Sequence, residues 1–249
     1  MRELKIELMK IKRRSVWLVL LALWVIQSLY LFWGTMNLEE KKQGWLMILY
    51  QLPLLNGIMM PTVMAVMASR LTDTEHKGNM WKLLETIQQK NRIYWNKALC
   101  GFLFILSFCI LQMLSALIAG IYKGYEGMPE FWAYGLYFTE TFCISLGLYL
   151  LQMMLSVIFQ NQMIALAIGL CGSMAGLFLM FMPQWKILRY LIIWGNYGAT
   201  MFVGGDWNRE TRITTFYYMN IDKIAVCLSI LWIFVFYFIG KRLFTRMEV

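Results

Sequence analysis

The sequence predicts an all-α, polytopic membrane protein with six transmembrane helices, and two observations lead to this class. Hydrophobic residues make up 60% of the 249 residues and charged residues only 15%, whereas a soluble domain carries about 25% charged residues. Long stretches without a charge recur along the chain, and about 20 apolar residues allow a helix to cross a hydrocarbon core of about 30 Å. Residues 1–249 are therefore predicted to form a single membrane domain.

The N-terminal segment Met1–Arg14 predicts a short amphipathic helix that lies on the cytoplasmic surface of the membrane. Leu4, Leu8 and Ile11 recur at positions i, i+4 and i+7, so they share one helical face, and charged residues occupy much of the rest. A charged tail that only anchors the first span would explain the basic residues equally well, but it would leave the apolar stripe unexplained.

Six stretches are long and apolar enough to be spans. The first is longer than the apolar core of a signal peptide, which is about 7–15 residues. The charge-free stretch 141–185 is too long for one helix, and we divide it at Gln160–Gln162. The predicted spans are Ser15–Gly34, Trp45–Ser69, Ala98–Tyr122, Phe131–Phe159, Met163–Met182 and Ile224–Gly240.

Glycine and proline add detail to this pattern. Gly172 and Gly176 in the fifth span give the spacing that lets another helix approach closely. Pro53 and Pro61 in the second span predict a kink, which serves either as a hinge or as a static bend. Tyr190–Gly205 is uncharged but short and rich in glycine, so it is predicted to be an interfacial or re-entrant segment between the fifth and sixth spans.

Lysine and arginine are distributed unevenly between the predicted loops. Fifteen of the 23 lie in the two terminal tails or between the second and third spans, and eight lie in the other loops. Because basic residues collect on the cytoplasmic side, both termini and the loop between the second and third spans are predicted to be cytoplasmic. The net charge of +9 then indicates contact with anionic lipids rather than with nucleic acid.

The sequence shows no sign of an enzyme. It lacks the G-x-x-x-x-G-K-[ST] phosphate loop and the motifs of serine and zinc hydrolases. His76 is the only histidine and has no ligand cluster around it, so no metal site and no cofactor are predicted in this chain. The five cysteines fall within apolar stretches, which favours buried thiols over disulfides.

The densely charged stretch Asp73–Lys97 is predicted to be a water-facing loop between the second and third spans. It resembles the cytoplasmic loop of ABC type-2 permeases, and it is most similar to the lantibiotic self-protection (immunity) branch of that family. The residues that carry the resemblance are Glu75, His76, Lys77 and Gly78, then Trp81, Lys82, Leu83 and Leu84, and then Arg92, Tyr94 and Lys97.

The resemblance implies a permease subunit of a bacterial plasma-membrane exporter. ATP and Mg²⁺ would be bound by a separate ATP-binding subunit, in two copies, and a second related permease or a second copy of this chain would complete the membrane dimer. The motif from Glu75 to Leu84 would be a coupling helix, with Trp81, Leu83 and Leu84 as apolar anchors for the ATPase. The alternative is that these three side chains lie in the headgroup layer.

The implied substrate is a lantibiotic-like peptide, cationic and amphipathic, that is moved from the membrane to the outside. Another hydrophobic drug or lipid-like compound is the alternative substrate, and a non-transporting sensor or scaffold is the alternative function. Polar side chains within the spans or in the outer loops are candidate substrate contacts. They are Gln27, Asn56, Glu140, Glu126 and Glu130. Glu140 fits either a pathway or a shallow site near the headgroups.

Overall fold

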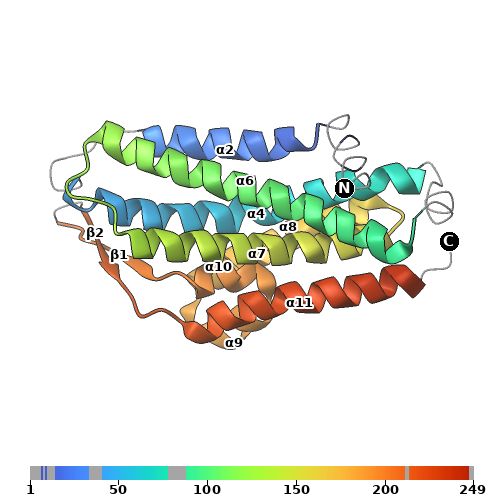
Figure 1. Cartoon of the computed structure of the whole chain (residues 1–249). Coiled ribbons are helices and arrows are strands. Elements are labelled where there is room, and N and C mark those ends of the chain that lie inside the picture. The colour runs from blue at the N-terminus through green and yellow to red at the C-terminus, as the bar shows by residue number, and fades with distance from the viewer. Residues whose placement is uncertain are drawn as a thin grey trace.

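The computed structural model describes residues 7, 9, 15–33, 41–77, 88–210 and 213–246, with only the backbone described for 73–77 and 183. Long helices run alongside one another and form a single bundle (Figure 1). They are α2 (Trp17–Phe32), α4 (Gly44–Lys77), α6 (Lys90–Lys123), α7 (Phe131–Ile158), α8 (Gln162–Phe181) and α11 (Lys223–Arg246).

The two ends of the bundle differ. α4 ends, α6 begins and α11 ends at the same end (Figure 1), which we call the connection end because residues 78–89 link α4 to α6 there. The opposite end carries two short strands, and we call it the hairpin end. Since α11 ends where α4 ends and α6 begins, this arrangement agrees with a C-terminus on the same side of the membrane as the predicted coupling loop.

Each of the six predicted spans corresponds to one of these helices. In the described chain, five helices are long and apolar enough to cross a membrane, namely α4, α6, α7, α8 and α11. The sixth, α2, is apolar but has only 16 residues. A polytopic helical membrane protein is thus confirmed, whereas the crossing of α2, and with it the count of six, stays a prediction.

The prediction of a water-facing loop over Asp73–Lys97 was wrong at both ends. Helix α4 continues to Lys77, and α6 begins at Lys90 rather than at Ala98. Charged residues were read as the limits of the spans, but a helix does not end where the hydrocarbon ends, because its polar last turns extend into the headgroup region.

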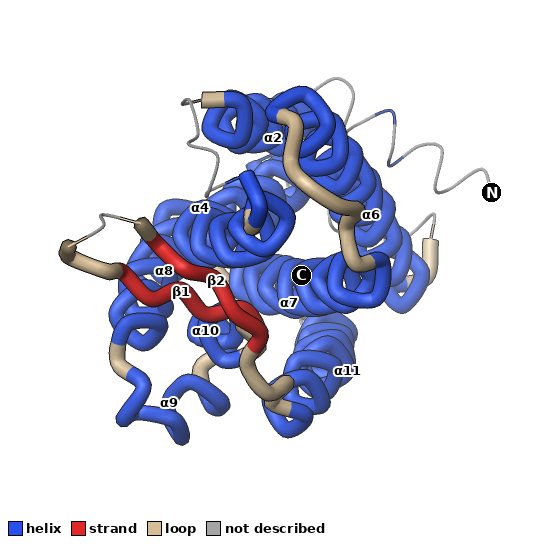
Figure 2. The backbone as a smooth tube through the Cα atoms, turned by 90° about the vertical axis from the view of Figure 1, so that its left-hand side faces the viewer, coloured by secondary structure: helices blue, strands red, loops and turns tan. Residues whose placement is uncertain are grey.

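Helix α7 lies at the centre of the bundle. In the end-on view it is surrounded by α4 and α8 on one side, α6 above and α11 below (Figure 2). Within the apolar part of each helix, 72% of the residues of α7 are buried, against 17% in α11. Helix α11 therefore lies at the periphery and leaves most of its surface for lipid or for another chain.

The predicted interfacial segment folds back against the bundle as short helical pieces. They are η1 (Pro183–Trp185), α9 (Lys186–Leu191), η2 (Ile193–Gly195) and α10 (Asn196–Ala199). Ile193 and Tyr197 are each only 2% exposed. Gly172 and Gly176 of α8 adjoin Trp194, and a Cβ atom at either glycine would overlap that residue. The small residues of α8 are thus used for close packing: Gly172 and Gly176 pack against η2, whereas Gly169, where a Cβ atom would overlap Ala65, packs against the long helix α4.

A β-hairpin at the hairpin end departs from the all-α prediction. Strands β1 (Val203–Trp207) and β2 (Thr214–Tyr218) pair antiparallel, with Val203 opposite Tyr218. The hairpin is fixed to the bundle because the backbone N–H of Phe216 donates a hydrogen bond to Oε1 of Gln43 at 2.7 Å. The segment TTFYY is rich in threonine and aromatic residues, which favour strands. The sequence analysis did not predict the strand because five residues within a polar region give only a weak strand pattern.

Candidate functional site

The connection end is organised around Lys97, whose side chain is only 1% exposed. Its ammonium group donates a hydrogen bond to the backbone carbonyl of Leu71 in α4, at 2.8 Å, and lies 3.5 Å from Oε2 of Glu7. The backbone carbonyl of Lys97 accepts a hydrogen bond from the hydroxyl of Tyr149 in α7, at 2.8 Å. One residue of α6 therefore joins α4, α7 and the N-terminal segment.

Tyr94, one turn earlier in α6, attaches the same region to α11. It is 1% exposed, and its ring lies 5.7 Å from that of Tyr237 and 5.9 Å from that of Phe244. Gly240 makes this contact possible, since a Cβ atom there would overlap the hydroxyl of Tyr94. Two of the residues that carry the family resemblance, Tyr94 and Lys97, are thus buried structural contacts at the base of the predicted coupling loop.

The predicted coupling residues are described only in part. The backbone of Glu75, His76 and Lys77 forms the last turn of α4. The remaining predicted coupling residues lie outside the described residues: Gly78, Trp81, Lys82, Leu83 and Leu84. The two helices that flank them are described, and the ammonium group of Lys97 in α6 bonds to α4 at the connection end.

A second polar cluster lies inside the bundle, in the half nearer the hairpin end. The amide of Gln27 in α2 donates to Oδ1 of Asn56 in α4 at 2.9 Å. The amide of Gln112 in α6 donates to Oε1 of Gln27 at 2.6 Å and to Oδ1 of Asn56 at 3.0 Å. The hydroxyl of Tyr137 in α7 donates to Oε1 of Gln112 at 2.7 Å and accepts from Nδ2 of Asn56 at 2.8 Å.

This polar cluster joins four helices, and all four residues are at most 2% exposed. Buried polar groups in a membrane protein need such partners because hydrocarbon offers none. The structure therefore brings together two of the predicted pathway residues, Gln27 and Asn56. Sequence analysis missed Gln112 and Tyr137, although a glutamine within the charge-free stretch of the third span was a usable signal.

Glu140 in α7 is buried within the bundle, with 5% of its surface exposed, while its depth relative to the headgroups stays a prediction. Its carboxylate interacts with the side chain of Thr200, while its Oε1 atom has no hydrogen-bond partner. Asn196, which accepts a hydrogen bond from Thr200 at its backbone carbonyl, is 1% exposed and its side-chain amide is likewise unpaired. Unpaired buried polar atoms of this kind require an explanation.

Glu126 and Glu130 lie at the hairpin end, apart from the other predicted pathway residues. Both are exposed, and both line a small pocket of about 130 Å³ together with Lys42 and Tyr218. Oε2 of Glu130 accepts a hydrogen bond from the indole of Trp132 at 2.8 Å. The predicted pathway residues therefore form three separate sites: the polar cluster, the surroundings of Glu140, and this acidic pocket.

An ion pair fixes the start of α11 to α9. Nζ of Lys186 lies 3.3 Å from Oδ2 of Asp222, and the hydroxyl of Tyr190 donates a hydrogen bond to the same carboxylate. Partial burial acts to raise the pKa of Asp222, but Tyr190, the backbone N–H of Ala225 and Lys186 outweigh it and hold the pKa below its usual value of 3.8. Hydrogen bonds with Tyr190 and Asp222 raise the pKa of Lys186.

Within the described part of the chain, no three His, Cys, Asp or Glu side chains gather into a group that could hold a metal ion. The candidate functional features of the described chain are the helix contacts of Lys97, the buried polar groups and the charged residues at the two ends of the bundle.

Comparison with known proteins agrees with this arrangement. Residues 3–176, which include α2, α4, α6, α7 and most of α8, match the family model described as ABC-2 family transporter protein. No curated protein and no solved structure matches the chain. The match covers well over half of the sequence, and the chain therefore belongs to the ABC-2 transporter family, as a membrane transport component rather than an enzyme.

Proposed function

We propose that this chain is the permease subunit of an ABC exporter in a bacterial plasma membrane. It expels a lantibiotic-like peptide from the membrane to the outside, and a separate ATP-binding subunit, in two copies, supplies the energy. A second copy of the chain or a related permease completes the membrane dimer. Family membership supports the role as a permease, and the geometry of the connection end supports the coupling to an ATPase.

One observation carries the coupling argument: a buried ammonium group bridges the two helices that flank residues 78–89. Lys97 lies in α6 and bonds to Leu71 in α4, so a movement of the coupling segment moves both helices together. Because α6 also bonds to the central helix α7 through Tyr149, that movement reaches the middle of the bundle. The contacts of α6 with α4 and α7 can transmit such a movement, because packed helix interfaces switch between discrete arrangements rather than deforming gradually.

The charge distribution supports a cationic substrate. Glu126 and Glu130 line the pocket at the hairpin end, which is the outer end when residues 78–89 are cytoplasmic. Glu140 lies between this pocket and the centre of the bundle, and one of its carboxylate oxygens is unpaired. Carboxylates at these positions attract a basic peptide toward the outer side.

The test is ATP-driven peptide export by the permease co-expressed with its ATP-binding subunit. Trp81→Ala should abolish export while leaving the amount of permease in the membrane unchanged, because aromatic anchors dominate docking energy. Trp33→Ala is the matched control, since Trp33 is 82% exposed at the end of α2 and its carbonyl accepts a hydrogen bond from Lys123 at the hairpin end of α6. Unchanged export by Trp81→Ala would contradict coupling through this residue.

The same assay separates the alternatives. Export of a hydrophobic dye without export of peptide would indicate a drug or lipid-like substrate and would overturn the peptide proposal. A complex that hydrolyses ATP but moves neither compound would indicate a sensor or scaffold.

A further inference from the structure

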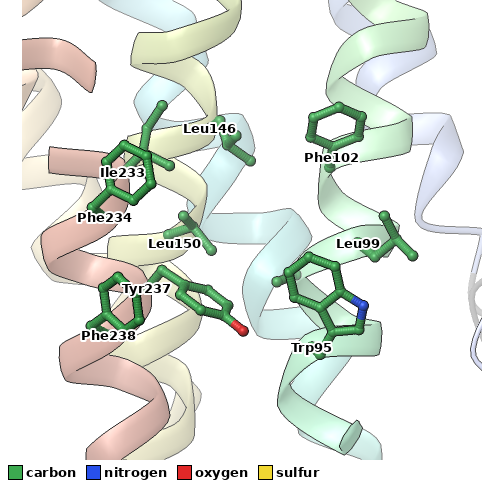
Figure 3. Close-up of a pocket in the computed structure, with 10 residues that line it drawn as sticks. Trp95, Leu99, Phe102, Leu146, Leu150, Ile233, Phe234, Tyr237 and Phe238 are labelled. Atoms are coloured by element: carbon green, nitrogen blue, oxygen red, sulfur yellow. The ribbon is translucent and has the colours of Figure 1, made fainter. Parts of the chain in front are cut away.

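A groove runs between α6, α7 and α11 on the outside of the bundle (Figure 3). Its volume is about 400 Å³, within the range of about 300–1,000 Å³ that is typical of sites for small ligands. Its lining side chains are apolar or aromatic, among them Trp95 and Leu99 from α6, Leu150 from α7, and Phe234, Tyr237 and Phe238 from α11.

The groove lies where α11 packs along α7 and meets α6 through the rings of Tyr94 and Trp95, both of which lie near Tyr237. Phe234 and Phe238 are 55% and 61% exposed, so the groove opens away from the bundle. Counted along α6, its lining residues lie about 8–18 Å from the start of the helix. The groove therefore lies in the half of the bundle nearer the connection end, at the depth of the acyl chains of one leaflet.

The end of the groove nearer the connection end is bordered by two aromatic side chains, and two cations follow the lining residues along α11. Trp95 and Tyr237 face each other across it, with ring centroids 5.9 Å apart (Figure 3), and such side chains favour the border between hydrocarbon and headgroups. Lys241 lies four residues after Tyr237, and Arg242 lies four residues after Phe238, so both continue the groove-lining face of α11 by one turn. Arg242 is exposed, and Lys241 is half-buried.

We propose that this groove binds one anionic phospholipid, with an acyl chain between α6 and α11 and the phosphate near Lys241 and Arg242. An apolar groove followed by two cations matches the acyl chain and the phosphate of such a lipid. A zwitterionic lipid would fill the same groove, but its headgroup has no net negative charge to attract the two cations. The bound lipid would stabilise the peripheral helix α11 against α6, beside the aromatic contacts of Tyr94 and Trp95. This inference is independent of the exported substrate.

Native mass spectrometry of the full chain in detergent tests the proposal, with dioleoyl phosphatidylglycerol and dioleoyl phosphatidylcholine as probes. One molecule of phosphatidylglycerol should bind per chain, more tightly than phosphatidylcholine. The double variant Lys241→Gln/Arg242→Gln should raise the Kd for phosphatidylglycerol by about five-fold for each cation removed and leave that for phosphatidylcholine unchanged. Lys223→Gln is the matched control, because it removes a cation at the opposite end of the same helix.

A groove-filling variant, Leu99→Trp, should weaken the binding of both lipids, and Phe234→Ala gives a second measurement from the opposite wall of the groove. Equal affinity for the two lipids, or an equal effect of Lys223→Gln and the double variant, would overturn the proposal. Disulfide-linked dimers formed through Phe238→Cys would also overturn it, since they would show that a second copy of the chain covers the groove.

Discussion

The ammonium group of Lys97 donates a hydrogen bond to the backbone carbonyl of Leu71 at 2.8 Å. The two residues lie on either side of the segment that links α4 to α6, 26 positions apart in the chain. Leu71 lies six residues before the end of α4, and a backbone carbonyl has two lone pairs, so it can accept this bond from α6 as well as one from within its own helix. One contact thus holds the start of α6 beside the last turns of α4.

Lys97→Met should destabilise the protein by about 3–5 kcal/mol, the usual cost of removing one partner from a buried ion pair. The substitution leaves the carboxylate of Glu7 without its 3.5 Å partner and removes a hydrogen bond from Leu71. Unfolding by denaturant in detergent measures the change. Glu7→Gln/Lys97→Met should cost less than the sum of the two single variants, because it removes both charges together; strict additivity would show that the pair does not interact.

Asn56→Leu should destabilise the bundle because Asn56 bonds to Gln27, Gln112 and Tyr137 at once. Hydrogen bonds between membrane helices contribute about 0.6 kcal/mol on average and up to about 1.7 kcal/mol, so a loss of roughly 1–3 kcal/mol is expected from several such bonds. Ile58→Leu, two residues away at a 43% exposed position, is the control. The free energy of unfolding should fall for Asn56→Leu and remain unchanged for the control; equal values would rule out a stabilising role for the polar cluster.

Gly172→Ala should disrupt the contact between α8 and η2, since the new methyl group would overlap the indole of Trp194. Gly135→Ala in α7 is the matched change, because nothing lies within 4 Å of a Cβ atom there. Alanine in an open helical position stabilises by about 0.5–1 kcal/mol relative to glycine, so the two variants should shift the thermal midpoint in opposite directions. A rise for both would mean that Trp194 does not pack against Gly172.

The ion pair at the start of α11 predicts an acid-dependent stability. Because the folded protein lowers the pKa of Asp222, the charged form contributes stability above the usual pKa of 3.8, and that contribution is lost as the pH falls below it. Asp222→Asn should reduce stability at neutral pH and flatten the decline toward acid. Asp206→Asn, on β1, should do neither. Thermal melting at a series of pH values measures both variants, and an unchanged acid decline in Asp222→Asn would contradict this account.

The sequence predicted the long helices well because membrane spans have a simple requirement, a long apolar stretch without charges. It predicted the helix limits poorly wherever a polar residue lies inside. Lys97 was assigned to a water-facing loop, although Glu7 and Leu71, far away in the chain, provide the partners that allow its burial. Such partners cannot be identified from the sequence alone, because they depend on which helices pack together.

The candidate site could be predicted to a similar extent. Gln27 and Asn56 stood out as polar residues within spans, and the structure joins them; Tyr137 did not, because a tyrosine in a span is common at interfaces. Glu126 and Glu130 line one pocket, and Glu140 does not line it. The sequence could not predict this separation, because the position of a side chain along the bundle axis depends on how the helices align with one another. The hairpin at Val203–Tyr218 was missed because two five-residue strands give a weak pattern.

The central claim is that the coupling segment faces the cytoplasm and meets the ATP-binding subunit. Determining on which side of the membrane residue 81 lies tests this claim most directly. Trp81→Cys would be placed in a background with Cys171→Ser and Cys227→Ser, the exposed thiols of the described chain, and treated with a membrane-impermeant maleimide. The account predicts labelling in inside-out vesicles, none in right-side-out vesicles, and protection when the ATP-binding subunit is present. Labelling in right-side-out vesicles alone would contradict it.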